Sequence, residues 1–354
     1  MNARSDTVSR ARPPAGARRW LVTGAAGFIG SHLVEELLRR GDQVTGLDNF
    51  ATGRRANLDD VLATLPTDAP ARLTFIEGDI RDQDTCRRAA VDATYVLHQA
   101  ALGSVPRSID DPLTTNEINV GGFLNMLIAA RDAGVRRFVY ASSSAVYGDA
   151  TADIKREGEE GQPLSPYAAS KRTNELYAAT FTHSYAMSTV GLRYFNVYGP
   201  RQDPAGAYAA VIPRWIGRLL AGERCVIYGD GETSRDFTHV DDVVQANIAA
   251  ADAPASQQAS DSPWAAVYNV AYGRRTTLNE LYRLLRAAVA EHQAQAAELE
   301  PDYQPFRTGD VPHSAADTKR ARNALAYRPT VEPEDGLRRT VDWFAARRSV
   351  VADQ

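Results

Sequence analysis

The chain has 354 residues, a net charge of −4, 44% apolar and 24% charged residues, as expected for a globular protein of one large or two ordinary domains. The small net charge predicts no nucleic-acid or membrane partner, and no stretch has the roughly 18 apolar residues of a membrane helix. Cys86 and Cys225 form neither a disulfide framework nor a metal-ligand pattern, which favours a reducing, cytoplasmic compartment and predicts no metal site.

Residues 1–18 carry several arginines but no apolar core, so they predict a mobile tail rather than a secretory signal. A transit peptide is the less favoured alternative, because Asp6 and the proline pair do not suit an amphipathic helix. From Trp20 onward, short apolar runs alternate with helical patterns. The runs predict strands at residues 21–23, 43–47, 73–76, 95–97, 138–142 and 190–194. Apolar periodicity predicts helices at residues 31–40, 122–132 and 166–184. This alternation indicates a doubly wound parallel sheet with helices on both faces.

After about Arg193 the pattern loosens, with shorter strands and more proline and glycine. We therefore expect a first domain over residues 19–192 and a smaller C-terminal α/β domain over residues 193–354. Part of residues 237–271 is expected to pack back on the first domain. The later pattern predicts a polar surface loop and then an amphipathic helix, at residues 252–263 and 278–293.

Three glycines lie where the first predicted strand meets the first predicted helix, in the stretch "VTGAAGFIGS". Gly24, Gly27 and Gly30 have two residues in each gap. At such a turn, bare backbone can approach a pyrophosphate while helix N–H groups face it. The alternative is a tight turn without a ligand, whereas a P-loop is excluded because no Lys-Ser or Lys-Thr pair follows Gly30. The turn therefore indicates a Rossmann-type dinucleotide site.

Asp48 ends the next predicted strand, where a carboxylate can accept hydrogen bonds from the adenosine ribose. This position favours NAD over NADP, because a carboxylate repels the 2′-phosphate of NADP. Arg54 and Arg55 follow closely and keep NADP open as an alternative.

Two further stretches suggest chemistry: "SSSAVYG", which follows a predicted strand, and "SPYAASK", which opens a helix. Ser165 is the expected N-cap and Pro166 the first-turn proline, so Tyr167 and Lys171 lie one turn apart on one face. A lysine ammonium, together with the positive nicotinamide of NAD, would lower the pKa of the tyrosine. The tyrosinate would then be a general base for an alcohol, assisted by a hydroxyl of the serine cluster.

With these motifs together, residues 19–345 resemble an extended short-chain dehydrogenase/reductase, and in particular the bacterial NAD-dependent nucleotide-sugar 4-epimerases. The resemblance implies a catalytic trio of Ser143, Tyr167 and Lys171, with Ser144 the less favoured hydroxyl. It implies that bound NAD contacts Gly24, Gly27, Phe28, Ile29, Asp48, Asn49, Asp79, Ile80, Gln99, Ala100, Tyr167 and Lys171.

The same resemblance implies a UDP-sugar substrate. Arginines suit a pyrophosphate because they offer paired N–H donors. Taken singly, Arg235 with Asp236 and Arg307 with Asp310 could instead be ordinary surface ion pairs. The substrate contacts that the resemblance implies are Gly103, Ser104, Ser143, Ser144, Asn196, Ala210, Val211, Tyr228, Arg235, Arg307, Asp310 and Ser314.

Members of this family begin by oxidising a sugar C4 hydroxyl, and neighbouring acid–base groups determine the fate of the resulting 4-keto sugar. Dehydratases carry an Asp-Glu pair just after the catalytic hydroxyl residue and decarboxylases a nearby Glu, whereas this chain has Ser144 and Ala145 there. Without such groups the 4-keto sugar can only turn over and be reduced on its other face, which predicts a 4-epimerase. The alternatives are a dehydratase or decarboxylase on the same scaffold, and an NAD-binding scaffold protein without catalysis.

The stretches "HQAALGSVPRS", "GLDNFATG" and "GDGETSRDF" resemble epimerases of UDP-N-acetylglucosamine and its uronic acid. Ser314 stands where galactose-type epimerases carry a bulky tyrosine, so it leaves room for a 2-N-acetyl group. We expect interconversion of UDP-N-acetylglucosamine and UDP-N-acetylgalactosamine for polysaccharide or O-antigen synthesis. UDP-N-acetylglucosaminuronic acid and UDP-glucose are alternative substrates. A homodimer through residues 122–132 and 166–184 is also implied.

Two histidines invite a catalytic role, but neither is assigned one. His98 is expected to pack beside the cofactor at a strand end, and His239 to belong to a helix start before Asp241 and Asp242.

Overall fold

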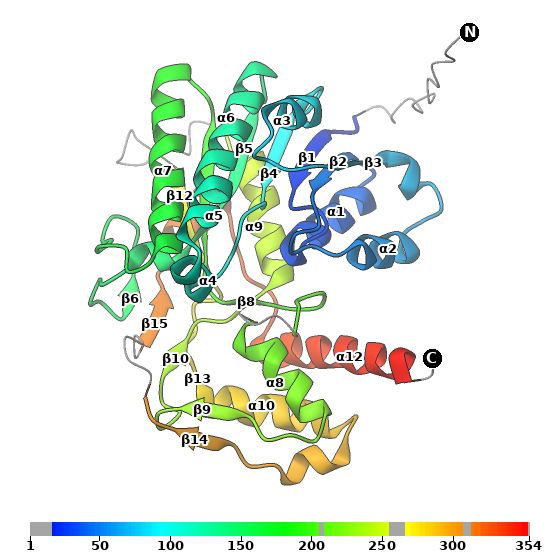
Figure 1. The fold of residues 1–354 in the computed structure, drawn as a ribbon, viewed down its shortest axis with the longest axis vertical. Coiled ribbons are helices and arrows are strands. Elements are labelled where there is room, and N and C mark those ends of the chain that lie inside the picture. Colours follow the sequence, from blue (N-terminus) through cyan, green and yellow to red (C-terminus); the bar gives the residue numbers. More distant parts are fainter. Residues whose placement is uncertain (1–15, 205–208, 255–265, 307–312, 353–354) are drawn as a thin grey trace.

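The computed structural model describes residues 16–204, 209–254, 266–306 and 313–352. Its centre is a seven-stranded sheet in the order β12-β7-β5-β4-β1-β2-β3, with every neighbouring pair parallel (Figure 1). The chain winds outward in both directions from the middle of the sheet, so the predicted doubly wound α/β fold is confirmed. The strands are β1 (Arg19–Thr23), β2 (Gln43–Asp48), β3 (Leu73–Glu77), β4 (Tyr95–His98), β5 (Arg137–Ser143), β7 (Thr189–Tyr194) and β12 (Ala266–Val270).

Helices cover both faces of the sheet, and a separate apolar core fills each face. One face carries α1 (Phe28–Arg39), α2 (Arg55–Thr64) and α9 (Val240–Asp252). The other carries α3 (Gln83–Ala90), α6 (Phe123–Asp132) and α7 (Pro166–Tyr185). Between these elements lie η1 (Ala69–Arg72), α4 (Val105–Asp110), α5 (Pro112–Asn116), the π-helix η2 (Glu117–Gly122) and η3 (Ser144–Tyr147).

Several boundaries differ from those expected. Helix α1 begins three residues early, because Gly27 takes an extended conformation and acts as its N-cap. Arg18, the last residue of the expected tail, is bound to the fold, since its backbone N–H donates to Asp42 and its guanidinium pairs with Asp252. Helix α10 (Leu278–Ala290) stops three residues before the expected Gln293. The expected loop at residues 252–263 lies mostly outside the described residues.

The second domain lies beyond the carboxyl ends of the sheet strands (Figure 1). It contains a four-stranded sheet in the order β13-β10-β15-β6. Two separate two-stranded sheets pair β9 with β14 and β8 with β11. Helices α8 (Val211–Leu220), α10 and α12 (Pro333–Ala352) surround its apolar core. The remaining elements are β6 (Ile154–Lys155), β8 (Val197–Tyr198), β9 (Val226–Tyr228), β10 (Ser234–Arg235), β11 (Thr238–His239), β13 (Thr276–Thr277), η5 (Ala294–Glu298), β14 (Asp302–Gln304), β15 (His313–Ala316) and α11 (Lys319–Leu325).

The chain passes between the two parts more than once. After β11 it returns to the large sheet, where α9 packs on α1 and β12 pairs with β7. Strand β6, which follows η3, pairs in turn with β15 of the second domain. Among the described residues, no helix is both long enough and apolar enough to span a membrane.

Candidate active site

The turn between β1 and α1 can form only because Gly24 and Gly30 have no side chain. Gly24 has a φ of +68°, and a Cβ there would lie 2.9 Å from the backbone nitrogen of Ala100. A Cβ on Gly30 would lie 1.9 Å from the Gly24 carbonyl oxygen. The Gly27 N–H donates to that same oxygen at 3.0 Å. The turn therefore places the N-terminus of α1, with its free N–H groups, at the carboxyl ends of the strands.

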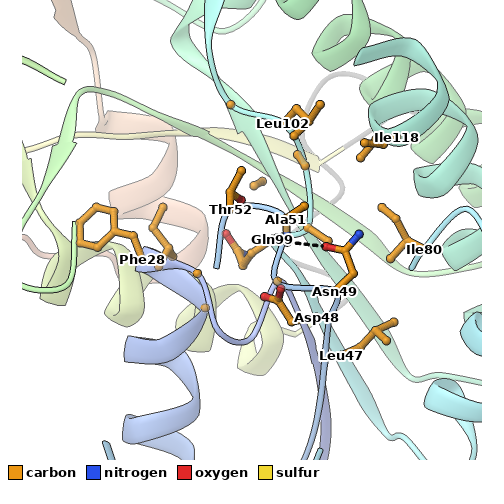
Figure 2. A pocket seen from close by; sticks show the side chains of 18 of the residues that line it. Phe28, Leu47, Asp48, Asn49, Ala51, Thr52, Ile80, Gln99, Leu102 and Ile118 are labelled. Carbon is orange, nitrogen blue, oxygen red and sulfur yellow. Dashed lines mark hydrogen bonds between the residues drawn. The ribbon is translucent and has the colours of Figure 1, made fainter. Parts of the chain in front are cut away.

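A cavity of about 350 Å³, within the usual range for small-molecule sites, opens beside this turn (Figure 2). In Figure 2, Asp48 and Asn49 at the end of β2 lie between Phe28 and Ile80. Gly103 also contributes to the wall. The structure brings all the expected cofactor contacts to this one cavity: Gly24, Gly27, Phe28, Ile29, Asp48, Asn49, Asp79, Ile80, Gln99, Ala100, Tyr167 and Lys171.

The cavity wall also contains residues that the sequence motifs do not indicate. Ser142 and Tyr194 lie at the carboxyl ends of strands that were predicted, so strand ends were the available signal. Ile118 lies in the π-helix η2, which no local pattern indicates. Further lining residues that were not predicted are Leu47, Ala51, Thr52, Gly78, Ala101, Leu102 and Ala141.

Asp48 organises the end of the cavity formed by β2. Its carboxylate accepts hydrogen bonds from the backbone N–H groups of Ala26, at 2.9 Å, and Phe50, at 2.8 Å. Burial raises the pKa of Asp48, and these backbone N–H groups oppose the rise. Backbone N–H groups of Asn49 and Gly27 lower this pKa as well, so the carboxylate is anchored both to the glycine turn and to the loop after β2.

Arg54 and Arg55, which left NADP as an alternative cofactor, contact other side chains of the protein. Arg54 pairs with Asp203 at 2.7 Å. Arg55 stacks over Phe50 and pairs with Glu77 at 3.4 Å. Both guanidinium groups are therefore engaged with other partners, while the buried carboxylate of Asp48 stays at the cavity. This arrangement favours a cofactor without a 2′-phosphate.

The expected trio meets at the end of β5. Ser165 caps α7 by accepting from the Ala168 N–H at 3.1 Å, with Pro166 in the first turn as predicted. Tyr167 shares a side-chain hydrogen bond with Ser143. The Lys171 Nζ donates to the Ala141 carbonyl oxygen at 2.9 Å and lies 6.0 Å from the centre of the Tyr167 ring.

Burial controls the titration of this trio. It lowers the pKa of Lys171 to about 8. It raises the pKa of Tyr167, and the Ser143 hydrogen bond opposes that rise. In the absence of NAD, desolvation outweighs any effect of the lysine, whose ammonium is bound to a carbonyl; the expected lowering of the tyrosine pKa, which also depends on the positive nicotinamide of NAD, stays a prediction.

Neither histidine takes part in this arrangement. His98 ends β4, binds the Thr23 hydroxyl at 2.9 Å and packs between Phe123 and Phe138. Burial lowers the pKa of His98 to about 3, so it stays neutral. His239 caps α9, accepting from the Asp241 N–H at 3.2 Å. No cluster of three metal-ligating side chains occurs within the described ranges.

The expected substrate contacts are more scattered than the cofactor contacts. Ser104 caps α4, and Ser144 begins η3 directly after Ser143. Asn196 follows β7, and its side chain donates to the Asp236 carbonyl oxygen at 3.0 Å. Of the expected substrate set, Gly103 is the member that lines the cavity among described residues.

The remaining substrate residues belong to the second domain. Arg235 of β10 lies opposite Ser314 of β15 in the parallel ladder. Ala210 is the N-cap of α8, Val211 is its first residue and Tyr228 ends β9. Arg307 and Asp310 lie outside the described residues.

The fold and this site define a class of protein. The sequence model of the NAD dependent epimerase/dehydratase family matches residues 20–271, and the chain belongs to that family. A UDP-glucose 4-epimerase of Mycolicibacterium smegmatis is 39% identical over 328 residues, covering 92% of this chain and 98% of that protein. UDP-glucuronate 4-epimerase 4 of Arabidopsis thaliana is 33% identical over 344 residues, covering 92% of this chain and 74% of that protein.

A solved structure gives a third comparison. The UDP-N-acetylglucosamine 4-epimerase of Methanobrevibacter ruminantium, in complex with UDP-N-acetylmuramic acid, has a TM-score of 0.83 and 38% identity. The match covers 94% of this chain and 99% of that one. The three relatives are named for three different sugars, so they agree on the class of protein but not on one sugar.

NAD is the cofactor of this family, and the residues present fit it. The glycine turn is a cradle that a Cβ would fill. The start of α1 offers N–H groups for a pyrophosphate, and Asp48 offers a carboxylate for a ribose. Tyr167 and Lys171 stand at the same cavity, so a bound nicotinamide would lie within reach of the trio.

Proposed function

We propose that the chain is an NAD-dependent nucleotide-sugar 4-epimerase acting on UDP-N-acetylglucosamine and UDP-N-acetylgalactosamine. The observation that carries the proposal is that Tyr167 and Lys171 line the same cavity as the dinucleotide-binding turn, with Ser143 beside Tyr167. When bound, NAD would take up a hydride from the sugar C4 and later return it.

The chain's own residues then handle the proton and the orientation. Tyr167 Oη would accept the proton of the C4 hydroxyl and give it back after the keto sugar has turned. Ser143 would hold the same oxygen, because its hydroxyl already reaches the tyrosine. Lys171, fixed by its hydrogen bond to Ala141, would hold its ammonium beside the tyrosine and favour the phenolate.

The carboxylates at the cavity support epimerisation over dehydration or decarboxylation. Among described residues that line it, the acidic side chains are Asp48 and Asp79. Asp48 lies at the end of β2 and accepts backbone N–H groups, and Asp79 follows β3 and binds Arg81. The residues after Ser143 are Ser144 and Ala145, which cannot exchange a proton with C5 or expel water from C6.

The small side chain of Ser314 supports an N-acetylated sugar as the substrate. Ser314 lies directly across the ladder from Arg235, which we assign to the UDP pyrophosphate. A small side chain there leaves space for a 2-N-acetyl group beside the hexose. UDP-glucose, UDP-glucuronate and UDP-N-acetylglucosaminuronic acid are the alternative substrates, the first two because relatives are named for them.

Steady-state rates on UDP-glucose, UDP-N-acetylglucosamine and the two matching uronic acids test the choice of sugar. We expect the highest kcat/KM on UDP-N-acetylglucosamine, with a product of unchanged mass. A product of lower mass would indicate a dehydratase or a decarboxylase. Failure to exchange hydride at C4 with any of the four would contradict the 4-epimerase and favour a non-catalytic NAD-binding protein.

We also propose that the enzyme is a homodimer through the side of the sheet covered by α6 and α7. Ile109, Leu113 and Leu176 are large apolar side chains exposed on α4, α5 and α7. Such a cluster is typical of an interface. Light scattering should give about twice the chain mass of 38.5 kDa, and a value equal to that mass would contradict the dimer.

A further inference from the structure

The face of α7 that carries Tyr167 and Lys171 continues for one more turn to Glu175. These side chains are four residues apart, so they lie along one side of the helix. All three reach the end of β5, Tyr167 and Lys171 through the hydrogen bonds described above. The third contact is to Ser142, whose Oγ donates to the Glu175 Oε1 at 2.6 Å.

Glu175 is 4% exposed, yet its charge is fully matched. Arg193 lies opposite Ser142 in the β5–β7 ladder and donates from Nε and Nη2 to the two carboxylate oxygens, each at 2.8 Å. Arg172 adds a bond of 2.9 Å from Nη1 to Oε2. Together with the Ser142 hydroxyl, four donors fill the four acceptor positions of the carboxylate.

Arg193 is itself fixed from other directions. It is 2% exposed, pairs with Glu160 and lies 4.9 Å from the centre of the Tyr147 ring. The Tyr147 hydroxyl donates to Asn269 of β12 at 2.7 Å. A buried arginine of this kind cannot leave its carboxylate without a large desolvation cost, so the position of Glu175 is rigid.

We propose that Glu175 is a positioning residue for Ser143 and Tyr167, acting through Ser142. Ser142 immediately precedes Ser143, so a hydroxyl anchored to Glu175 fixes the backbone from which the Ser143 side chain extends. With Lys171 bound to Ala141, α7 then fastens three successive residues of β5. Misplacement of a reacting group by about 1 Å can cost about 100-fold in rate, so this anchoring has a catalytic consequence.

Ser142→Ala is the most selective test, because it removes the link and leaves the Glu175–Arg193 pair intact. We expect kcat on the preferred UDP-sugar to fall about tenfold, with KM within about twofold of wild type. The unfolding temperature and the bound NAD content should stay unchanged. Ser142→Thr keeps the hydroxyl and should restore the rate. Glu175→Gln should lower kcat further, because an amide cannot accept from all four donors.

A matched control lies farther along α7, at its contact with the neighbouring strand β7. Thr189 of β7 is buried, and its hydroxyl bonds to Thr182 and to the Ala178 carbonyl oxygen of α7. Thr189→Val should change stability alone and leave kcat unchanged. Equal losses of kcat in Thr189→Val and Ser142→Ala would overturn the proposal. It would also be overturned if the loss of kcat in Ser142→Ala matched the loss of bound NAD.

A second readout does not require turnover. NMR titration of tyrosine-labelled protein, with the Tyr167 signal assigned from Tyr167→Phe, reports the pKa of that phenol. Because the Ser143 hydrogen bond lowers this pKa, Ser142→Ala should raise it. An unchanged pKa would overturn the positioning role. The inference rests on the proposed function, but a wild-type protein without epimerase activity would contradict that function and leave this titration valid.

Discussion

The cofactor half and the substrate half of the molecule differ in how their residues are positioned. In the first, residues from six predicted strands and their following loops meet at one cavity. In the second, the expected contacts belong to short strands of two to four residues, helix starts and a segment outside the described residues. A long parallel sheet brings its carboxyl ends to one edge, whereas short strands depend on what surrounds them.

The difference teaches where specificity can vary. The large sheet positions the residues that line the cofactor cavity. Helix α7, which packs on that sheet, carries Tyr167 and Lys171. The sugar is held by elements whose length and order the sheet does not impose. This agrees with relatives of similar identity being named for different UDP-sugars.

The largest effect is expected at Tyr167. Tyr167→Phe removes the proton acceptor and keeps the ring, so turnover should fall about 1,000-fold while NAD content and unfolding temperature stay unchanged. The measurement is the rate of product formation at saturating UDP-sugar. Near-normal epimerisation would rule out Tyr167 as the general base.

Asp48 tests the cofactor half directly. Asp48→Ala should weaken NAD binding about 10- to 100-fold, because a charged acceptor at the end of β2 is lost. The measurement is NAD retained after purification and its affinity by titration. Asp82→Ala is the control, since Asp82 also accepts two backbone N–H groups but does not line the cavity. NAD retention equal in the two variants would argue against the ribose role.

Ser314 tests the substrate half. Ser314→Tyr should lower kcat/KM for N-acetylated sugars about tenfold relative to UDP-glucose, because the ring would overlap the acetyl group. Ser314→Ala should leave the ratio unchanged, since it adds no volume. Competition assays with paired substrates measure the ratio directly. If the tyrosine variant keeps its preference, selectivity lies elsewhere among the short strands.

The smallest effect is expected on the stability of the protein, at Asp236, which directly follows β10. Burial raises the pKa of Asp236, next to Arg235, to about 6 from an ordinary 3.8, and its carboxylate accepts from the Gly273 and Ala316 N–H groups. The folded protein therefore binds this proton more tightly than the unfolded chain does. Stability should fall as pH rises from about 4 to about 6, by about 2 kcal/mol from this group.

Asp236→Asn removes that titration. Denaturant unfolding of both proteins across the window should show the variant gaining stability relative to wild type as the pH rises from about 4 to about 6. A constant difference between the two curves would mean that Asp236 titrates normally in the folded protein.

Much of the first domain was predictable because buried parallel strands are continuous apolar runs, and β1 to β5 and β7 lie within about two residues of their expected positions. Two-residue strands such as β10 and β13 have no periodicity to detect. The rise of the Tyr167 pKa in the absence of NAD has no sequence signal, because desolvation depends on the packed surroundings. The Ser142–Glu175–Arg193 contact joins three elements far apart in sequence, and no local spacing indicates it.

The return of the chain to the large sheet has a consequence for folding. A fragment ending near residue 192 would lack α9 and β12, so β7 would become an open edge and the α1 face would lose part of its apolar cover. Neither half is a separable module under this topology. We expect one cooperative unfolding transition for the whole chain, and expression of the first 192 residues alone should give an aggregating product.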